Sequence, residues 1–437
     1  MNKILIRIKE QVRGLIERGA LHIFLGNFVT KFVAFFGSIF IVRLLSKADY
    51  GTLGYMENLF HYVYLFAGLG LTNALFRYVI LADNIIKKRT FYDYVIQKST
   101  MLNLALVIVS CVIAVCYPHP EQFQQVTWLL PILLLSIPLN SLVDSHTGML
   151  RAMFNNKAYA LASCLTIVLV VGLKYALSVI WGLNGAVFAA LLAYGAMTLI
   201  LTVYIHKCYF SEVPKEPLKD PKEKKAVFGY SIQYMITNGI WALFMLNDVF
   251  LLGQLLGDSA MVADYKVAYV LPGNLSLISS SIGVFVSPYF VKHENDVHWI
   301  KRHYKKTFLV TMGIVGLAVV AVYILAGPLI TLLYGRQYLN VVPVMRILLI
   351  ASFINNGLRY TNANLLSAMG QVKYNMFVSI TGMVVQVTVN LFVIPRHGMM
   401  GIAYTSVGVY ALMAMFLFGI FYVKYFRREK SISGQKN

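Results

Sequence analysis

Charge is scarce in this chain, and acidic residues are the scarcest charged type. Only 13% of the 437 residues are charged, with 18 acidic against 38 basic residues, while 58% are hydrophobic and the mean hydropathy is +0.67. A soluble domain carries about 25% charged residues, and a disordered chain needs low hydrophobicity. A transmembrane β-barrel is built from short spans that alternate polar with apolar residues. These features exclude all three classes and leave a helical integral membrane protein.

Cysteine and catalytic motifs are also scarce. The four cysteines, Cys111, Cys116, Cys164 and Cys208, have no CxxC spacing, so neither a disulfide framework nor a zinc site is expected. The chain has no P-loop and no paired carboxylates on an accessible loop. It is therefore not expected to be an enzyme or to hold a cofactor. The alternative enzyme is a membrane-embedded glycan polymerase or ligase, but such enzymes normally work from a large outer loop, and every predicted outer connection is short.

Apolar segments long enough to cross a bilayer dominate the chain. A spanning helix needs about 20 mainly apolar residues. By that measure the sequence predicts an all-α, polytopic membrane protein with twelve spans, at 22–45, 53–77, 99–117, 126–150, 158–181, 184–206, 228–253, 265–291, 307–334, 342–367, 374–395 and 400–425.

The distribution of basic residues predicts the orientation. Lysine and arginine accumulate on the cytoplasmic side of membrane proteins, and most of the 38 basic residues fall there if both termini are cytoplasmic. The first span follows a basic segment (Lys3 to Arg18) and has no small-residue cleavage site, so we expect it to be retained. The net charge of +20 follows mostly from this topology, and no nucleic-acid partner is needed to explain it.

Short motifs recur between the two halves of the chain. The runs 150–153, 182–185 and 48–50 match 366–369, 398–401 and 263–265, each about 216 residues later. A proline-rich polar segment at 209–225 separates the halves and is typical of a solvated linker. The sequence therefore predicts lobes at 1–208 and 226–437, each with six helices, related by a parallel pseudo-two-fold repeat. Repeats of this kind occur in transporters, with the substrate site at the repeat interface.

The longer motifs resemble those of a known family. Asp248 to Gly273 (DVFLLGQLLGDSAMVADYKVAYVLPG) and Leu365 to Ala403 are similar to second-half signatures of polysaccharide and O-antigen flippases, and Arg43 to Gly51 is similar to their opening. These flippases form a branch of the multidrug/oligosaccharidyl-lipid/polysaccharide exporter superfamily.

The resemblance implies a V-shaped central cavity between the lobes and a location in the bacterial cytoplasmic (inner) membrane. It further implies alternating-access transfer of undecaprenyl-pyrophosphate-linked oligosaccharide to the outer leaflet. Such a protein would work with the bilayer, the lipid-linked glycan and polysaccharide assembly proteins. Drug exporters share the fold, so a cation-coupled multidrug exporter is the alternative.

Charges within spans are expensive, at about 2.5 to 3.5 kcal/mol each, and each suggests a functional role. Lys31, Lys174 and Arg359 would make a cavity positive, as a pyrophosphate requires, and arginine binds phosphate oxygens bidentately. Asn355 and Asn362 are expected on the face of Arg359 and suit sugar hydroxyls. These five residues are the predicted substrate site. The alternatives are that Arg359 pairs with a structural carboxylate, that the asparagines bind neighbouring helices and that Lys174 extends toward the lipid interface.

Acidic residues within spans are candidates for ion coupling. Asp248, assisted by Asn247, could exchange a proton or hold Na⁺, and Glu57 one turn before His61 could relay protons. The alternative for Asp248 is a structural salt bridge, with Lys31 as one partner. The alternative for Glu57 and His61 is that they satisfy each other structurally.

Overall fold

The computed structural model describes residues 20–293 and 296–426, and within these ranges all regular structure is helical. The basic residues from Lys3 to Arg18 and those beyond residue 426, which were used to predict the orientation, lie outside the described residues. The chain divides into two compact units, 1–238 and 239–437.

From residue 20 onward, the described part of the first unit contains seven α-helices and three short helical turns, and an eighth helix continues into the second unit. They are α2 (Ala20–Leu44), α3 (Lys47–Tyr64), η1 (Ala67–Gly70), α4 (Leu71–Leu81), α5 (Ile85–Cys116), η2 (Glu121–Phe123), α6 (Val126–Leu134), α7 (Ser136–Ala152), α8 (Asn156–Ile205), η3 (His206–Phe210) and the first part of α9 (Pro221–Leu256).

The second unit begins within α9 and has the same helical character. Its elements are α10 (Ser259–Asn274), α11 (Ser276–Lys292), α12 (Val297–Ile324), α13 (Ala326–Tyr334), η4 (Arg336–Val341), α14 (Val342–Phe353), η5 (Ile354–Arg359), α15 (Tyr360–Ala368) and α16 (Val372–Tyr425).

The division between the units lies within α9, later in the chain than the linker predicted at 209–225. The first part of α9 belongs with the first unit because Val227 is buried in that unit's core and Glu223 forms an ion pair with Lys87 at 2.8 Å. Arg77 also lies 4.9 Å from the centre of the Tyr230 ring. The first unit therefore extends beyond the predicted linker and includes the first part of α9.

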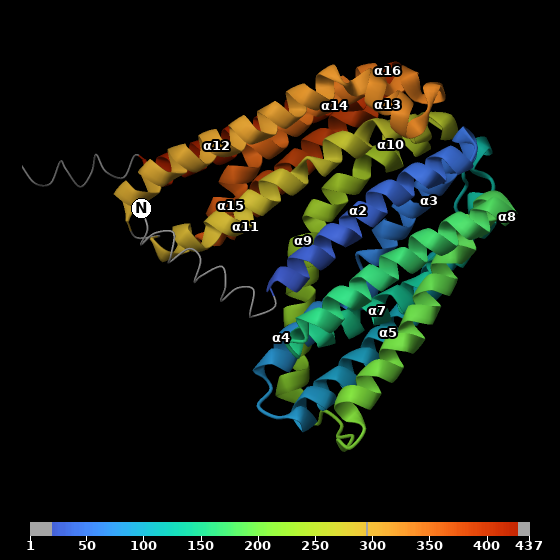
Figure 1. Ribbon diagram of the computed structural model, residues 1–437, viewed down its shortest axis with the longest axis vertical. Coiled ribbons are helices and arrows are strands. Elements are labelled where there is room, and N and C mark those ends of the chain that lie inside the picture. The colour runs from blue at the N-terminus through green and yellow to red at the C-terminus, as the bar shows by residue number, and fades with distance from the viewer. Residues whose placement is uncertain (1–19, 294–295, 427–437) are drawn as a thin grey trace, which may run out of the picture. The chain divides into compact units, whose positions relative to one another are not determined.

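The longest helices, α8 and α16, are each interrupted by a glycine. Gly182 has φ 59° and ψ −132°, and Gly398 has φ 53° and ψ −137°. A Cβ built on Gly185 would lie 1.9 Å from the Leu177 carbonyl oxygen. Since residues eight apart in a straight helix are separated by about 12 Å, the chain must fold back here (Figure 1). In α16 a Cβ built on Gly401 would likewise lie 3.1 Å from the Val393 carbonyl oxygen and 2.4 Å from its Cγ1.

A second pair of matched motifs also adopts one conformation in both units. After 150–153 the amide of Asn155 donates to the Leu150 carbonyl at 3.0 Å, and after 366–369 that of Gln371 donates to Leu366 at 2.8 Å. The intervening Phe154 and Gly370 have φ of 57° and 75°. Both are therefore helix ends with a left-handed residue. The sequence repeat thus corresponds to a repeat in local structure.

The described residues contain nine candidate membrane spans by length and composition, or ten if the bent pair formed by α3 with η1 and α4 is one span. The helices α8 and α16, which fold back at a glycine, are each counted as one span. Each half of either helix is nevertheless longer than the roughly 20 residues that a span requires. The polytopic, all-α prediction is confirmed, and the number of twelve stays a prediction.

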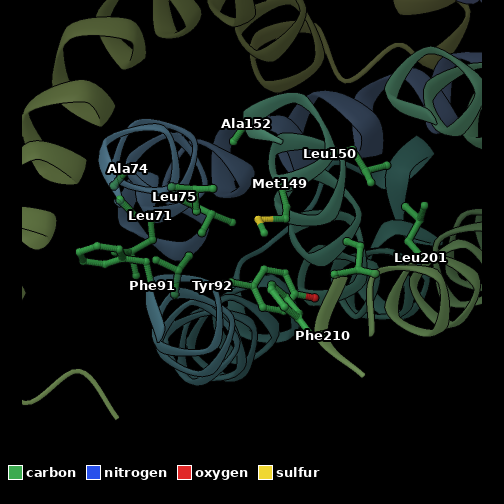
Figure 2. Packing of buried hydrophobic residues seen from close by; sticks show 14 of the residues in the cluster. Leu71, Ala74, Leu75, Phe91, Tyr92, Met149, Leu150, Ala152, Leu201 and Phe210 are labelled. Carbon is green, nitrogen blue, oxygen red and sulfur yellow. The ribbon is translucent and has the colours of Figure 1, made fainter. Parts of the chain in front are cut away.

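Aliphatic and aromatic side chains form the core of the first unit. Figure 2 shows Leu71 and Leu75 of α4 packed near Phe91 and Tyr92 of α5 and Met149 of α7. All five are at most 3% exposed. Helices in lipid associate through close packing rather than the hydrophobic effect. This core therefore holds in place the helices that bear the polar residues of the first unit.

Replacement of Gly398 by alanine is expected to destabilise the protein by about 1–3 kcal/mol, because a side chain is strained at its backbone angles. Gly408 is helical, and nothing lies within 4 Å of a Cβ built there. Gly408→Ala is therefore the matched control and should be neutral or mildly stabilising. Thermal unfolding in detergent measures the stability of both variants. Equal melting temperatures would contradict the prediction that Gly398 needs backbone angles available only to glycine.

Candidate functional site

Asp248, on α9, is the centre of a polar cluster in the second unit. Its Oδ1 accepts hydrogen bonds from Gln386 Nε2 at 2.6 Å and from Asn390 Nδ2 at 3.0 Å, and its Oδ2 accepts one from the Tyr265 hydroxyl at 2.8 Å. Gln386 and Asn390 are four residues apart on α16, so they share one helix face. Three donors therefore hold one carboxylate within apolar helices.

The Asp248 cluster also contains oxygen atoms without partners. Gln386 Oε1 and Asn390 Oδ1 are buried and accept no hydrogen bond among the described residues, and the adjacent Asn247 has an unpartnered Nδ2. Buried polar atoms normally have partners. One carboxylate with two amide groups can supply the oxygen ligands that a small cation needs. The sequence predicted Asp248 and Asn247 but missed Gln386, Asn390 and Tyr265. The spacing of the two amides on an apolar helix was the available signal.

Arg359 lies at the end of η5, a π-helical turn between α14 and α15. Its Nε donates to Asn355 Oδ1 at 2.6 Å, and its guanidinium carbon lies 4.4 Å from the centre of the Trp241 ring. The side chain is only 4% exposed, and it forms no ion pair with a described carboxylate of its own unit. Arg359 is therefore a buried cation held by an amide and an aromatic face, and π-turns of this kind are frequent at functional sites.

Asn362 is turned toward another helix instead of joining Arg359. Its Oδ1 accepts from the Tyr304 hydroxyl on α12 at 2.7 Å, and its Nδ2 donates to the Leu358 carbonyl at 3.0 Å. The π-helical turn disturbs the simple spacing that placed Asn355, Arg359 and Asn362 on one face. The structure thus unites Asn355 with Arg359 and gives Asn362 contacts that join helices.

Lys174 and Glu57 form an ion pair between α8 and α3 in the first unit. Their side chains are 21% and 32% exposed. The sequence assigned Lys174 to substrate binding and Glu57 to ion coupling, whereas the structure brings the two together. Charge within the spans of this unit is therefore partly neutralised.

Lys31, on α2, differs from Lys174 in its surroundings. It is exposed, and it makes no hydrogen bond or ion pair with the described residues of its own unit. Its charge is consequently available to a ligand.

Replacement of Lys174 by alanine should lower stability by up to about 2.5 to 3.5 kcal/mol, because Glu57 would keep an uncompensated charge among apolar helices. The additional change Glu57→Gln removes that charge and should restore most of the loss. Thermal unfolding of the single and double variants measures the coupling. If the two substitutions changed the stability by strictly additive amounts, the ion pair would not stabilise the folded protein.

Among residues 20–293 and 296–426, no group of three or more His, Cys, Asp or Glu side chains could hold a metal ion. The Asp248 cluster is a separate case, because it combines one carboxylate with the amide oxygens of Gln386 and Asn390.

Comparisons with known proteins identify the fold. A family model described as "Polysaccharide biosynthesis protein" matches residues 40–343. No curated protein sequence matches the chain. An inward-facing multidrug resistance MATE family transporter of the MOP superfamily has a TM-score of 0.72 and 15% identity, covering 93% of this chain and 96% of that one.

Two further solved structures are similar. Lipid II flippase MurJ, in an inward closed conformation, has a TM-score of 0.71 and 16% identity, covering 92% of this chain and 87% of that one. A MOP superfamily transporter from Pyrococcus furiosus has a TM-score of 0.60 and 15% identity, covering 94% and 95%. At such identities the similarity shows the fold, and it confirms the exporter architecture expected from the sequence.

Proposed function

Because this chain belongs to the polysaccharide biosynthesis protein family, we propose that it is a flippase for undecaprenyl-pyrophosphate-linked oligosaccharide. The observation that carries the proposal is the combination of this family with a transporter fold shared by a lipid II flippase. The protein would act in the bacterial cytoplasmic membrane with both termini in the cytoplasm. It would move the glycan headgroup from the inner to the outer leaflet, for use by polysaccharide assembly proteins.

Lys31 and Arg359 are proposed to bind the pyrophosphate. Each is a cation on a membrane helix without a carboxylate partner in its own unit, and a cation is retained in such a place when it meets an anion or water. Arginine and lysine both bind phosphate, arginine bidentately. Arg359 is buried on Trp241 in this conformation, so its role requires that the transport cycle expose it. Asn355 would move with Arg359, and Lys174 and Asn362 are assigned weaker, indirect roles.

Asp248 is proposed to couple transport to a cation gradient. A proton would neutralise its carboxylate, and Na⁺ would bind Asp248 together with the Gln386 and Asn390 oxygens after their amide groups turn. The unpartnered amide oxygens support this role. Asn247 lies beside this cluster in sequence and is the further candidate ligand. Glu57 is less suited, because Lys174 already compensates its charge.

A multidrug exporter is the second candidate, and the similarity to a MATE family transporter favours it. Such a protein would take cationic amphiphiles. The unpaired cations Lys31 and Arg359 would repel that cargo, so they favour the flippase. A glycan polymerase or ligase would need catalytic groups on a face outside the membrane, where the connections are short.

Reconstitution tests the proposed function. Proteoliposomes are loaded with fluorescent undecaprenyl-pyrophosphate-linked glycan, and a membrane-impermeant quencher reports the leaflet that it occupies. Wild-type protein should accelerate translocation, and the double variant Lys31→Ala/Arg359→Ala should lower the rate at least tenfold. Efflux of cationic dyes without glycan translocation would establish the exporter instead.

A further inference from the structure

A polar cavity of about 210 Å³ lies within the first unit, between α2, α7 and α8. At about 30 Å³ per water, it has room for several water molecules, which is more than a single ion requires. We call it the first-unit polar cavity. Its polar lining residues are Thr30, Asn140, Asp144, Thr147, Ser163, Thr166 and Tyr194. No lysine or arginine is among its lining residues.

Four polar groups in this cavity are available to a ligand. The Tyr64 hydroxyl donates to Asp144 Oδ2 at 2.6 Å, whereas Asp144 Oδ1 accepts no hydrogen bond from the described residues of the unit. The Asn140 amide and the hydroxyls of Ser163 and Tyr194 likewise have no hydrogen-bond partner there. Asp144 is exposed even though its helix belongs to a candidate membrane span. A carboxylate in such a place is normally paired or faces a water-filled site.

The remaining hydroxyl groups add acceptors. Thr30 and Thr166 donate to the carbonyls of Gly26 and Ala162 in their own helices, both at 2.8 Å. Thr147 donates to the Asp144 carbonyl at 3.1 Å. Their protons are engaged while their oxygens keep lone pairs for a donor. The cavity thus offers several acceptors, with the Asn140 amide and the Ser163 and Tyr194 hydroxyls as donors, and it carries one negative charge.

This chemistry selects a polyhydroxylated ligand and disfavours a phosphate. Sugar hydroxyls both donate and accept, so they match amide, hydroxyl and carboxylate groups. A phosphate would meet the Asp144 charge with no cation in the lining to offset it. The volume is smaller than the roughly 300 Å³ at which drug-sized pockets begin, and it has room for about one sugar ring.

We propose that the first-unit polar cavity binds one sugar residue of the cargo through Asp144, Asn140 and Tyr194. This assignment rests on the proposed function, since it supplies a second contact for the same headgroup. The charged pyrophosphate and the sugar would then be bound by different residues. Glycan specificity would reside in the first unit, because the hydroxyl pattern is read in this cavity.

Saturation-transfer NMR of the full-length protein in detergent tests the proposal, with glucose, galactose and N-acetylglucosamine at millimolar concentration as probes. At least one sugar should bind the wild-type protein, and binding should weaken at least tenfold in Asn140→Ala and in Asp144→Ala. Asn238→Ala is the matched control, because Asn238 bonds within its own helix at the Tyr234 carbonyl. It should bind the sugar as the wild type does.

Asp144→Asn separates a sugar site from a cation site and also serves if Asp144→Ala does not fold. It keeps an acceptor oxygen, so sugar binding should fall less than in the alanine variant. Absence of binding by all three sugars, or binding unaffected by every cavity variant, would overturn the proposal. If Na⁺ raises the melting temperature of the wild type but not of Asp144→Asn, and no sugar binds, the cavity is a cation site.

The two proposals can fail separately. Sugar binding is measured without transport, so wild-type flipping with no sugar binding would reject the cavity assignment alone. Sugar binding in this cavity without translocation of lipid-linked glycan would reject the flippase and leave a glycan-binding site.

Discussion

Replacement of Asp248 by asparagine is expected to remove the dependence of transport on a cation gradient. Asparagine keeps the size of the side chain and one acceptor, but it removes the charge that would attract a proton or Na⁺. Gradient-driven translocation in proteoliposomes should fall at least tenfold, to the rate seen without a gradient. Because Gln386, Asn390 and Tyr265 all donate to the carboxylate, some loss of stability is also expected, of about 1–3 kcal/mol.

Asp258→Asn is the matched control for Asp248→Asn. Asp258 caps α10 by accepting from the Met261 amide at 3.0 Å, and asparagine is an equally good cap. The control should therefore transport normally and respond to the gradient. A response to the gradient that survives in Asp248→Asn would place coupling elsewhere and leave the cluster a structural role.

Replacement of Arg359 by alanine should lower flipping of the pyrophosphate-linked glycan at least tenfold per folded molecule. The change removes the cation proposed to meet the pyrophosphate, and it also removes the contact with the Trp241 face, which is worth about 2 kcal/mol when desolvated. Translocation is measured by quenching in proteoliposomes with equal amounts of folded protein. Arg359→Lys keeps the charge and should retain part of the rate.

Arg346 provides the control for the structural component of this loss. Its guanidinium carbon lies 5.1 Å from the centre of the Tyr323 ring, so it is also a membrane-helix arginine stacked on an aromatic side chain. Arg346→Ala should lower the melting temperature by a similar amount but leave flipping per folded molecule near the wild-type value. Equal rates for the two alanine variants would show that Arg359 acts only in folding.

Local features were predictable from the sequence. The apolar segments determined the helices, because a bilayer accepts only helices and closed barrels as spanning structures. The matched runs at 182–185 and 398–401 were predicted as repeats, and both form the same sharp reversal because glycine alone adopts those backbone angles readily. The family resemblance likewise depended on turn and packing residues that lie close together in the chain.

The contacts of each intramembrane charge were decided by the tertiary structure. The sequence identified Lys174, Glu57, Asp248 and Arg359 as candidates, yet it could not pair Lys174 with Glu57 across 117 residues or bring Asn390 to Asp248 across 142. Hydropathy and periodicity describe which residues share a helix face. Only the packing of helices distant in sequence determines which charge is neutralised, which is held by amides and which remains open to a ligand.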